Sequence, residues 1–325
     1  MNWGQSWENQ PPAAHLMLSP LSALYALGWT AYLATYQLGL KKPYRASIPV
    51  ICVGNLTVGG TGKTPLTMHL VEVLRRLGRE VVISCSGYGS PHSAAAEIAP
   101  EGRLSAAEWG DEAALFREEI ADCPPLIVGR RRVLAAQLAE QHFPNAVLLM
   151  DDGFQHLPLY KDISLTIDQD RRNRMCLPAG PYREMRSAGR RRATLVLPSE
   201  FEVVRTLRLG EAGGTPAVQE VDLLCAIGQP MGFMRALEGA GFTIGKAKFL
   251  PDHDPLTAGN LLAGLGEARP LVVTSKDWVK LRERNDLGNK QIVVASSSCV
   301  VEPAQEFAAW LEKHLNEADA ARNRK

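Results

Sequence analysis

A glycine-rich segment, GGTGKTP, contains the residues whose types and spacing most directly specify a chemistry. Glycines let the backbone approach a phosphate closely, the amine of Lys63 can reach β- and γ-phosphates, and the hydroxyl of Thr64 can bind Mg²⁺. The strict phosphate-loop pattern has a glycine where this chain has Thr57, so the loop is a variant. We predict ATP binding by Gly59, Gly60, Thr61, Gly62, Lys63, Thr64 and Pro65.

The residues on either side of this loop fit the same interpretation. Residues 48–53 are apolar and β-rich, which predicts a buried strand. Leu66 and Leu70 begin a helical spacing of apolar residues that Gly78 is well placed to end. In a strand, loop and helix of this order, backbone N–H groups and the helix N-terminus hold phosphate oxygens. A plain glycine turn with a surface lysine is the alternative, and the flanking pattern disfavours it.

Two adjacent carboxylates follow a second apolar run. Residues 146–150 predict a buried strand that leads into Asp151 and Asp152, and phosphoryl transfer needs a carboxylate for Mg²⁺ at such a strand end. Neighbouring strand residues point to opposite faces, so we assign Mg²⁺ to Asp152 and a supporting role to Asp151. Gln155 and His156 come shortly after, where they can orient phosphate or cap the loop.

A kinase also needs a group that accepts the proton of the acceptor hydroxyl. Candidates are Asp111 and Glu112 in WGDEAALF, and Asp252 beside His253 in FLPDHDPLT. A carboxylate oriented by a histidine suits this role, although WGDE alone is also typical of an ordinary helix N-terminus. Spacing along the chain leaves open whether Asp111 meets His253.

The N-terminal region contains a long uncharged segment. Residues 16–40 have no charged side chain, and Lys41, Lys42 and Arg45 follow them. The length could span a bilayer, but interspersed polar residues and tyrosines favour a helix in the membrane interface. Basic residues after the apolar run disfavour a cleaved signal peptide and place the following domain on the cytoplasmic side. A helix packed against the protein's own core is the alternative.

Size and composition limit the possible classes. The chain has 325 residues, 36 basic and 35 acidic, so we expect two lobes, no nucleic-acid partner and no obligate protein partner. Six scattered cysteines without a CxxC pair argue against a disulfide framework or a cysteine zinc site, and indicate the reducing cytoplasm.

These patterns predict an α/β fold of the P-loop NTPase type, with a mostly parallel sheet and flanking helices. A smaller C-terminal α/β lobe and an N-terminal membrane-interface helix complete it. A polar, glycine-containing stretch separates the lobes, and closure of the second lobe, which carries His253, would exclude water from the γ-phosphate. The predicted boundaries are 1–45 for the membrane-associated helix region, 46–200 for the kinase domain, 201–220 for a linker and 221–325 for the C-terminal domain.

A basic segment precedes that boundary. Residues 171–192 contain eight arginines against one carboxylate, Glu184. Such a patch would suit a phosphorylated lipid at an anionic membrane, while an ordinary solvated face explains at least half of these residues. The eight are Arg171, Arg172, Arg174, Arg183, Arg186, Arg190, Arg191 and Arg192.

Taken in order, the motifs of this sequence resemble those of the tetraacyldisaccharide 4'-kinase family, which phosphorylates the distal glucosamine of the lipid A precursor. The resemblance runs from the N-terminal helix to the last strands. It comprises VGNLTVGGTGKTP at 53–65, SGYG at 86–89, GDE at 110–112, DDGFQH at 151–156, PAGPYRE at 178–184, PDH at 251–253 and TSKDWVKL at 274–281.

The resemblance implies roles that spacing alone does not give. Asp111 would be the catalytic base with His253 as its partner, Lys63 a catalytic residue, and Thr64 and Asp152 the Mg²⁺ ligands. The substrate would be a tetraacyldisaccharide 1-phosphate, giving lipid IVA, at the cytoplasmic face of the inner membrane, with the enzyme peripheral or monotopic. Further contacts with phosphates or the lipid head group would come from Tyr88, Glu112, Arg132, Asp151, Gln155, His156, Arg183 and Glu184.

The chain also departs from the family pattern. Where Ser-Arg-Gly-Tyr-Gly is usual, it has CSGYG, so that Cys85 and Ser86 stand in place of Ser-Arg and a guanidinium is missing. Arg130 and Arg131 are the nearest replacements along the sequence. Ala113, Asp254 and Ser275 are smaller departures, in the segments that would contact substrate.

Without the resemblance, the residues support Mg·ATP binding with either phosphoryl transfer or hydrolysis. Two alternatives to the lipid kinase therefore remain at this stage: a P-loop NTPase acting on a protein partner, and a catalytically silent, nucleotide-gated module that binds a membrane.

Overall fold

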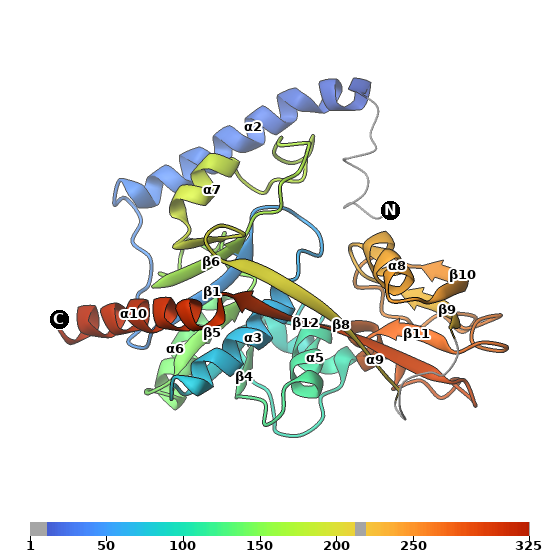
Figure 1. Ribbon diagram of the computed structural model, residues 1–325. Helices are drawn as coiled ribbons and strands as arrows, with labels where there is room; N and C mark the ends of the chain where they lie inside the picture. The colour runs from blue at the N-terminus through green and yellow to red at the C-terminus, as the bar shows by residue number, and fades with distance from the viewer. Residues whose placement is uncertain (1–11, 212–218, 325) are drawn as a thin grey trace.

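Two mixed β-sheets with helices around them make up the protein (Figure 1). The computed structural model describes residues 12–211 and 219–324. One sheet has seven strands and the other five, and the strands of each are mainly parallel. The α/β fold class predicted from the sequence is therefore confirmed.

The larger sheet forms the body of the first lobe. Its order is β3-β4-β2-β5-β1-β6-β7, and all neighbouring pairs are parallel except β3 and β4. Both faces of its centre are covered, which explains why β1, β2, β5 and β6 are continuous buried runs rather than alternating patterns. The strands are β1 Val50–Asn55, β2 Val81–Cys85, β3 Glu97–Ile98, β4 Leu126–Val128, β5 Val147–Asp151, β6 Ile163–Ile167 and β7 Leu195–Leu197.

The register of this sheet brings the two phosphate-side motifs together. Strand β1 pairs with β5 so that Val53 lies opposite Asp151, and the carboxyl ends of parallel strands share one edge. Helix α3 (Lys63–Arg76) starts directly after Gly62, whose φ of 84° suits glycine, and the chain turns away at Gly78 as predicted. Its apolar face packs on the sheet through Leu66 and Leu70.

Helices surround the larger sheet and lead into the site. The structure places α5 beside α9 of the second lobe, and α6 packs against the opposite face of the sheet from α3. These helices are η1 Pro91–Ala94, α4 Ala106–Trp109, α5 Asp111–Glu119, α6 Arg132–His142 and α7 Arg186–Arg192.

The smaller sheet belongs to the second lobe and has the order β10-β9-β11-β12-β8. All neighbouring strands are parallel except β12 and β8, which are antiparallel. Their pairing begins with Val293 opposite Glu211 and ends with Glu302 opposite Glu202. The elements are β8 Glu202–Glu211, β9 Glu220–Cys225, α8 Pro230–Gly239, β10 Thr243–Phe249, β11 Leu271–Thr274, α9 Ser275–Leu281 and β12 Ile292–Glu302.

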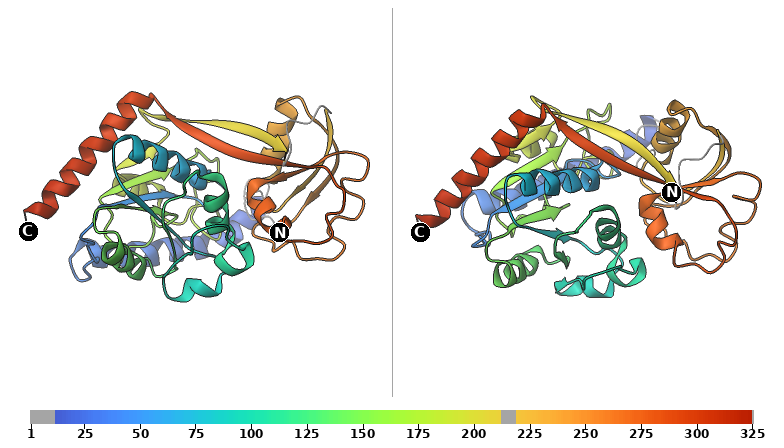
Figure 2. Two further views of the ribbon diagram at one scale, coloured as in Figure 1. Left: turned by 90° about the horizontal axis from the view of Figure 1, so that it is seen from below. Right: turned by 60° about the horizontal axis from the view of Figure 1, so that its bottom comes forward.

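The observed connection between the lobes differs from the predicted division in two respects. Residues 201–220, expected to be a linker, contain the strand β8, which forms with β12 a two-stranded ribbon between the lobes (Figure 2). The predicted C-terminal domain, 221–325, includes helix α10 (Ala304–Asn323), which returns to the first lobe. Its Phe307 and Leu311 join the same core as Leu66 of α3. The helical spacing of these residues predicts a buried face but does not tell which lobe covers it.

Helix α2 (Pro12–Gln37) lies along the first lobe beside α7 (Figure 1). One side is attached: Ser22 donates a hydrogen bond to the Cys176 carbonyl at 2.7 Å, and Tyr25 donates to the Arg183 carbonyl at 2.8 Å. Among the described residues, His15–Gln37 is the one helix long and apolar enough to cross a membrane. Only 11% of its most apolar window is buried, so the alternative of a core helix does not fit.

The return of α10 can be tested through its central aromatic residue. Phe307 is fully buried, with its ring centroid 5.4 Å from that of Phe201. We expect Phe307→Ala to lower the free energy of unfolding by about 3–5 kcal/mol, because it leaves a cavity in the core of the first lobe. Denaturant titration followed by circular dichroism measures this. The exposed Lys313 on the same helix provides the control, and a Phe307→Ala variant as stable as Lys313→Ala would contradict the assignment.

Candidate active site

The predicted phosphate-binding residues line one cavity between the lobes. Its volume is about 620 Å³, and its walls include all residues from Gly59 to Pro65, together with Glu112, Asp152, His253 and Lys276. The loop is held from behind, since the side-chain amide of Asn55 donates to the Thr61 hydroxyl at 2.9 Å. The structure therefore brings the phosphate loop and His253, which are far apart in the sequence, to the walls of one cavity.

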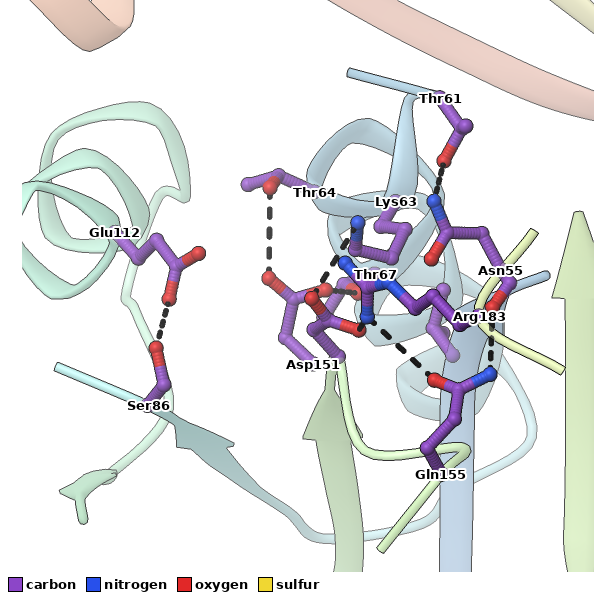
Figure 3. Close-up of polar contacts among 12 residues, drawn as sticks. Asn55, Thr61, Lys63, Thr64, Thr67, Ser86, Glu112, Asp151, Gln155 and Arg183 are labelled. Carbon is purple, nitrogen blue, oxygen red and sulfur yellow. Dashed lines mark hydrogen bonds and ion pairs between the residues drawn. The ribbon is translucent and has the colours of Figure 1, made fainter. Parts of the chain in front are cut away.

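The two adjacent aspartates have different partners, and Figure 3 shows those of Asp151. The Thr67 hydroxyl donates to Asp151 Oδ1 at 2.8 Å, and the Thr64 hydroxyl lies 3.4 Å from Asp151 Oδ2. Asp152 instead pairs with cations, its oxygens lying 3.5 Å from Lys63 Nζ and 3.2 Å from Arg183 Nη1. The two carboxylates do face different ways, but Thr64 contacts Asp151 and not Asp152, the predicted co-ligand.

Their surroundings shift the two carboxyl groups in opposite directions. Burial, reinforced by the negative charge of Glu112, raises the pKa of Asp151 to about 7. Burial also opposes ionisation of Asp152, but the charges of Lys63 and Arg183 outweigh it and lower the pKa of Asp152. Asp151 is thus the group at this edge whose charge is least compensated within the protein.

The second cluster joins Asp111 to His253. His253 Nδ1 lies 2.9 Å from Asp111 Oδ2, although the two residues are 142 positions apart. Asp111 begins α5 after Gly110, and His253 lies in the loop after β10 with a φ of 62°. Burial works against the Asp111 carboxylate, but His253 and Lys276 hold its pKa well below the usual range. The other oxygen, Asp111 Oδ1, is buried and has no hydrogen-bond partner among the described residues.

Two residues of this site were missed by the sequence analysis. Lys276 Nζ lies 3.2 Å from His253 Nε2 and 3.6 Å from Asp111 Oδ2, and Arg205 of β8 donates to the Thr61 carbonyl. The signal for Lys276 was its place just after a buried strand, at a helix start, which parallels Lys63 of the phosphate loop. Nothing local distinguishes Arg205 from other charged residues on a strand.

Several predicted contact residues bond within the protein. Arg132 is buried and donates to the Ser84 hydroxyl and the Asp151 carbonyl, so it fixes the strand ends behind the cavity. Glu184 is fully buried, and its carboxylate accepts hydrogen bonds from Arg192 at 2.6 Å and from Gln155 at 3.0 Å. These positions differ from the predicted direct contacts with phosphate or lipid, and they point to a scaffold for the neighbouring loop.

His156 and Tyr88 have different surroundings. Burial lowers the pKa of His156 to about 4, with the charge of Lys161 adding to the effect, so the ring is neutral at physiological pH. The Tyr88 ring centroid lies 5.1 Å from that of His253. Arg130, predicted as a replacement for the missing guanidinium, lies 5.9 Å from the Tyr88 ring, while the Ser86 hydroxyl donates to Glu112 at 3.0 Å.

The basic segment is partly neutralised by acidic residues. Asp168 forms ion pairs with Arg186 at 2.8 Å and with Arg190 at 2.6 Å, and Asp170 forms one with Arg174 at 3.0 Å. With Arg183 on Asp152 and Arg192 on Glu184, at least five of the eight arginines pair with carboxylates among the described residues, as expected of structural cations.

A phosphate loop between β1 and α3, carboxylates where β5 ends, and an aspartate–histidine pair across the cavity together define a P-loop phosphotransferase. The comparison with known families is more specific. The family model LpxK, tetraacyldisaccharide-1-P 4'-kinase, matches residues 14–316. The chain belongs to the tetraacyldisaccharide 4'-kinase family.

Individual relatives agree. The tetraacyldisaccharide 4'-kinase of Shewanella sediminis is 34% identical over 287 residues, covering 82% of each chain. That of Shewanella amazonensis is 34% identical over 308 residues, covering 85% of this chain and 86% of the relative. The crystal structure of LpxK from Aquifex aeolicus in complex with ATP superposes with a TM-score of 0.76 at 25% identity, covering 93% of this chain and 99% of that one.

The protein is thus an ATP-binding tetraacyldisaccharide 4'-kinase of lipid A biosynthesis. The predicted family, enzyme class and function are confirmed. This membership favours the kinase over both alternatives left open by the residues, the NTPase acting on a protein partner and the silent membrane-binding module.

The raised pKa of Asp151 predicts a pH-dependent stability. The native state holds the Asp151 proton more tightly than the unfolded chain, whose carboxyl pKa is about 3.9, so this group's contribution to stability is lost as pH rises toward about 7. Asp151→Asn should remove that loss. We expect its melting temperature, relative to wild type, to increase between about pH 5 and about pH 8 in the absence of nucleotide and divalent cations.

Differential scanning fluorimetry across this pH range measures the effect. Asp122→Asn, at an exposed turn, should follow the wild-type curve. A constant difference in melting temperature between Asp151→Asn and wild type would show that Asp151 is ionised in the native state throughout.

Proposed function

We propose that this kinase uses Asp111 to accept the proton of the sugar 4'-hydroxyl while the γ-phosphate of ATP is transferred to that oxygen. The supporting observation is the Asp111–His253 contact of 2.9 Å, with Asp111 Oδ1 buried and without a described partner. One carboxylate oxygen is therefore oriented by histidine, while the other has a lone pair that no donor among the described residues uses. A general base must offer such a lone pair to its proton donor.

The residues at the end of β5 fit a magnesium ion. Mg²⁺ prefers oxygen ligands, and Thr64, Asp151 and Asp152 offer a hydroxyl and two carboxylates at one edge of the sheet. Among the described residues there is no group of three or more His, Cys, Asp or Glu that could hold a metal ion. A cation beside Asp151 would also offset the repulsion from Glu112 that raises its pKa.

Thr64 and Asp152 remain our proposed ligands, and the contact between Thr64 and Asp151 adds Asp151 to the set. When bound, Mg²⁺ would neutralise negative charge on the phosphates.

The products of the transfer are a phosphate monoester and ADP. The 4'-oxygen forms a bond to the γ-phosphorus, the bond between the γ-phosphorus and the bridging β-phosphate oxygen breaks, and the hydroxyl proton passes to Asp111. Lys63, now paired with Asp152 at 3.5 Å, would stabilise charge on the leaving phosphate.

The same geometry supports the proposal that the lobes close around the substrates. Asp111 belongs to the first lobe and His253 to the second, and the cavity lies between them. Their contact depends on the position of one lobe against the other, so a shift of the ribbon β8–β12 would separate the base from its orienting group.

We also propose that α2 holds the kinase on the cytoplasmic membrane surface, where its lipid acceptor lies. Leu21, Leu24 and Leu27 are 55%, 66% and 66% exposed, and Lys41 and Lys42 follow the helix on the surface. Apolar side chains beside cations suit the boundary between acyl chains and anionic head groups.

Asp111→Asn tests the base. We expect kcat to fall by about 10²- to 10⁴-fold with ATP affinity unchanged, because the amide preserves shape but cannot take the proton. Turnover is measured as conversion of tetraacyldisaccharide 1-phosphate to the bisphosphate, and binding by calorimetry. Asp286→Asn, at an exposed site that pairs with Arg284, is the control. Undiminished turnover of Asp111→Asn would refute its role, whereas Lys63→Ala should lose turnover whichever group is the base.

A triple substitution of Leu21, Leu24 and Leu27 by glutamine tests the membrane surface. Each leucine transferred from water is worth about 1.5–3 kcal/mol when fully buried, so we expect binding to vesicles containing anionic lipid to weaken about 100-fold or more. Co-sedimentation measures this. The control is Leu134→Gln, a leucine 37% exposed on α6. Vesicle binding equal to wild type would exclude α2 as the membrane contact.

A further inference from the structure

Lys276 lies where the second lobe meets the Asp111–His253 pair. It is the second residue of α9, directly after the buried strand β11, and its side chain is 23% exposed. Its amine lies 3.2 Å from His253 Nε2, 3.4 Å from Asp252 Oδ1 and 3.6 Å from Asp111 Oδ2. An ammonium group has three N–H donors, and three protein acceptors surround this one.

Two contacts of His253, with Lys276 at Nε2 and with Asp111 at Nδ1, agree on which ring nitrogen carries the proton. An ammonium can donate a hydrogen bond but cannot accept one, so His253 Nε2 must be the acceptor. The proton of a neutral ring is then on Nδ1, and it points at Asp111 Oδ2, 2.9 Å away.

The charges around this group are consistent with a permanently charged lysine. Burial alone would lower the pKa of Lys276, but the carboxylates of Asp111 and Asp252 outweigh it and raise the pKa, with Glu112 and Asp277 adding to the effect. On the His253 side the facing groups are Asp252, at 3.9 Å from Nε2, and the Tyr88 ring. Lys280 of α9 also acts on Asp111, but it pairs with Asp277 at 3.3 Å.

We propose that Lys276 is a positioning residue for phosphoryl transfer, which fixes neutral His253 in the tautomer that donates to Asp111 Oδ2. The substrate hydroxyl is then directed to Asp111 Oδ1, the oxygen without a described partner. This rests on the proposed role of Asp111 as base. Lys276 acts through its contacts with His253 and Asp111 and does not itself take part in proton transfer.

Lys276 also lines the cavity that contains Lys63, so direct binding of a phosphate is the competing role. The two roles predict different defects. A phosphate ligand would be needed for ATP affinity, whereas a positioning residue would be needed for kcat and for the His253 tautomer.

The decisive measurement is the tautomer of His253 in ¹⁵N-histidine-labelled protein, read from the chemical shifts of the ring nitrogens. His253→Gln identifies the signal among seven histidines. In wild type we expect Nδ1 to carry the proton, and in Lys276→Met we expect Nε2–H to become populated. Lys276→Arg keeps a charged donor and should retain the wild-type tautomer. Lys246→Met, at an exposed lysine whose amine donates to the Gly264 carbonyl, is the matched control.

Kinetics on the same variants complete the test. We expect Lys276→Met to lower kcat by about 10- to 100-fold with ATP affinity unchanged, and Lys276→Arg to restore part of it. In an Asp111→Asn background, Lys276→Met should cost little more, because both act on one group. Melting curves verify that each variant is folded.

Two results would overturn the proposal: a wild-type His253 with its proton on Nε2, or a Lys276→Met variant that keeps the wild-type tautomer. Loss of ATP affinity with an unchanged tautomer would make Lys276 a phosphate ligand instead. Failure of the base assignment is distinguishable, because it appears as an active Asp111→Asn variant, whereas a change of the His253 tautomer in Lys276→Met, with Asp111 intact, reports on Lys276.

Discussion

The parallel pairing of β1 with β5 is the constraint on which the site depends. It aligns Val53 with Asp151, so the loop after one strand and the carboxylates where the other ends must share an edge. Burying Asp151 there is costly, and the hydroxyls of Thr67 and Thr64 and the charge of Lys63 compensate only part of that cost. The sheet thus holds the Asp151 carboxylate beside the phosphate loop, although its burial is only partly compensated. The free energy for holding it there must come from packing elsewhere in the fold.

That packing comes partly from the far end of the chain. The ribbon of β8 and β12 leaves the first lobe and returns to it, and α10 then packs Phe307 and Leu311 against the same core as α3. The second lobe is therefore an insertion between two elements fixed to the first. Its position relative to Asp111 is set by this double connection, and a contact of 2.9 Å to His253 across the lobes becomes possible.

Patterns within short stretches of the sequence predicted the features that depend on neighbouring residues alone. The buried runs at β1 and β5, the phosphate loop and the start of α3 follow from apolar content, glycine and helix spacing, and the strand limits differ by one or two residues. Long-range contacts could not be read in this way. The resemblance supplied the Asp111–His253 pair, but the position of Lys276 and the inward turn of Arg132 depend on tertiary packing, which a single sequence does not encode locally.

Asp151 and Asp111 show how one cavity can separate two tasks. Burial and a like charge raise the pKa of Asp151, whereas histidine and lysine hold that of Asp111 low, so the first is suited to respond to a cation and the second stays ionised. A carboxylate with so low a pKa is a weak base. In the loose transition state of phosphoryl transfer the nucleophile is little deprotonated, so orientation of the hydroxyl contributes more than basicity. The network around Asp111 then serves catalysis mainly by geometry: it fixes where one oxygen points.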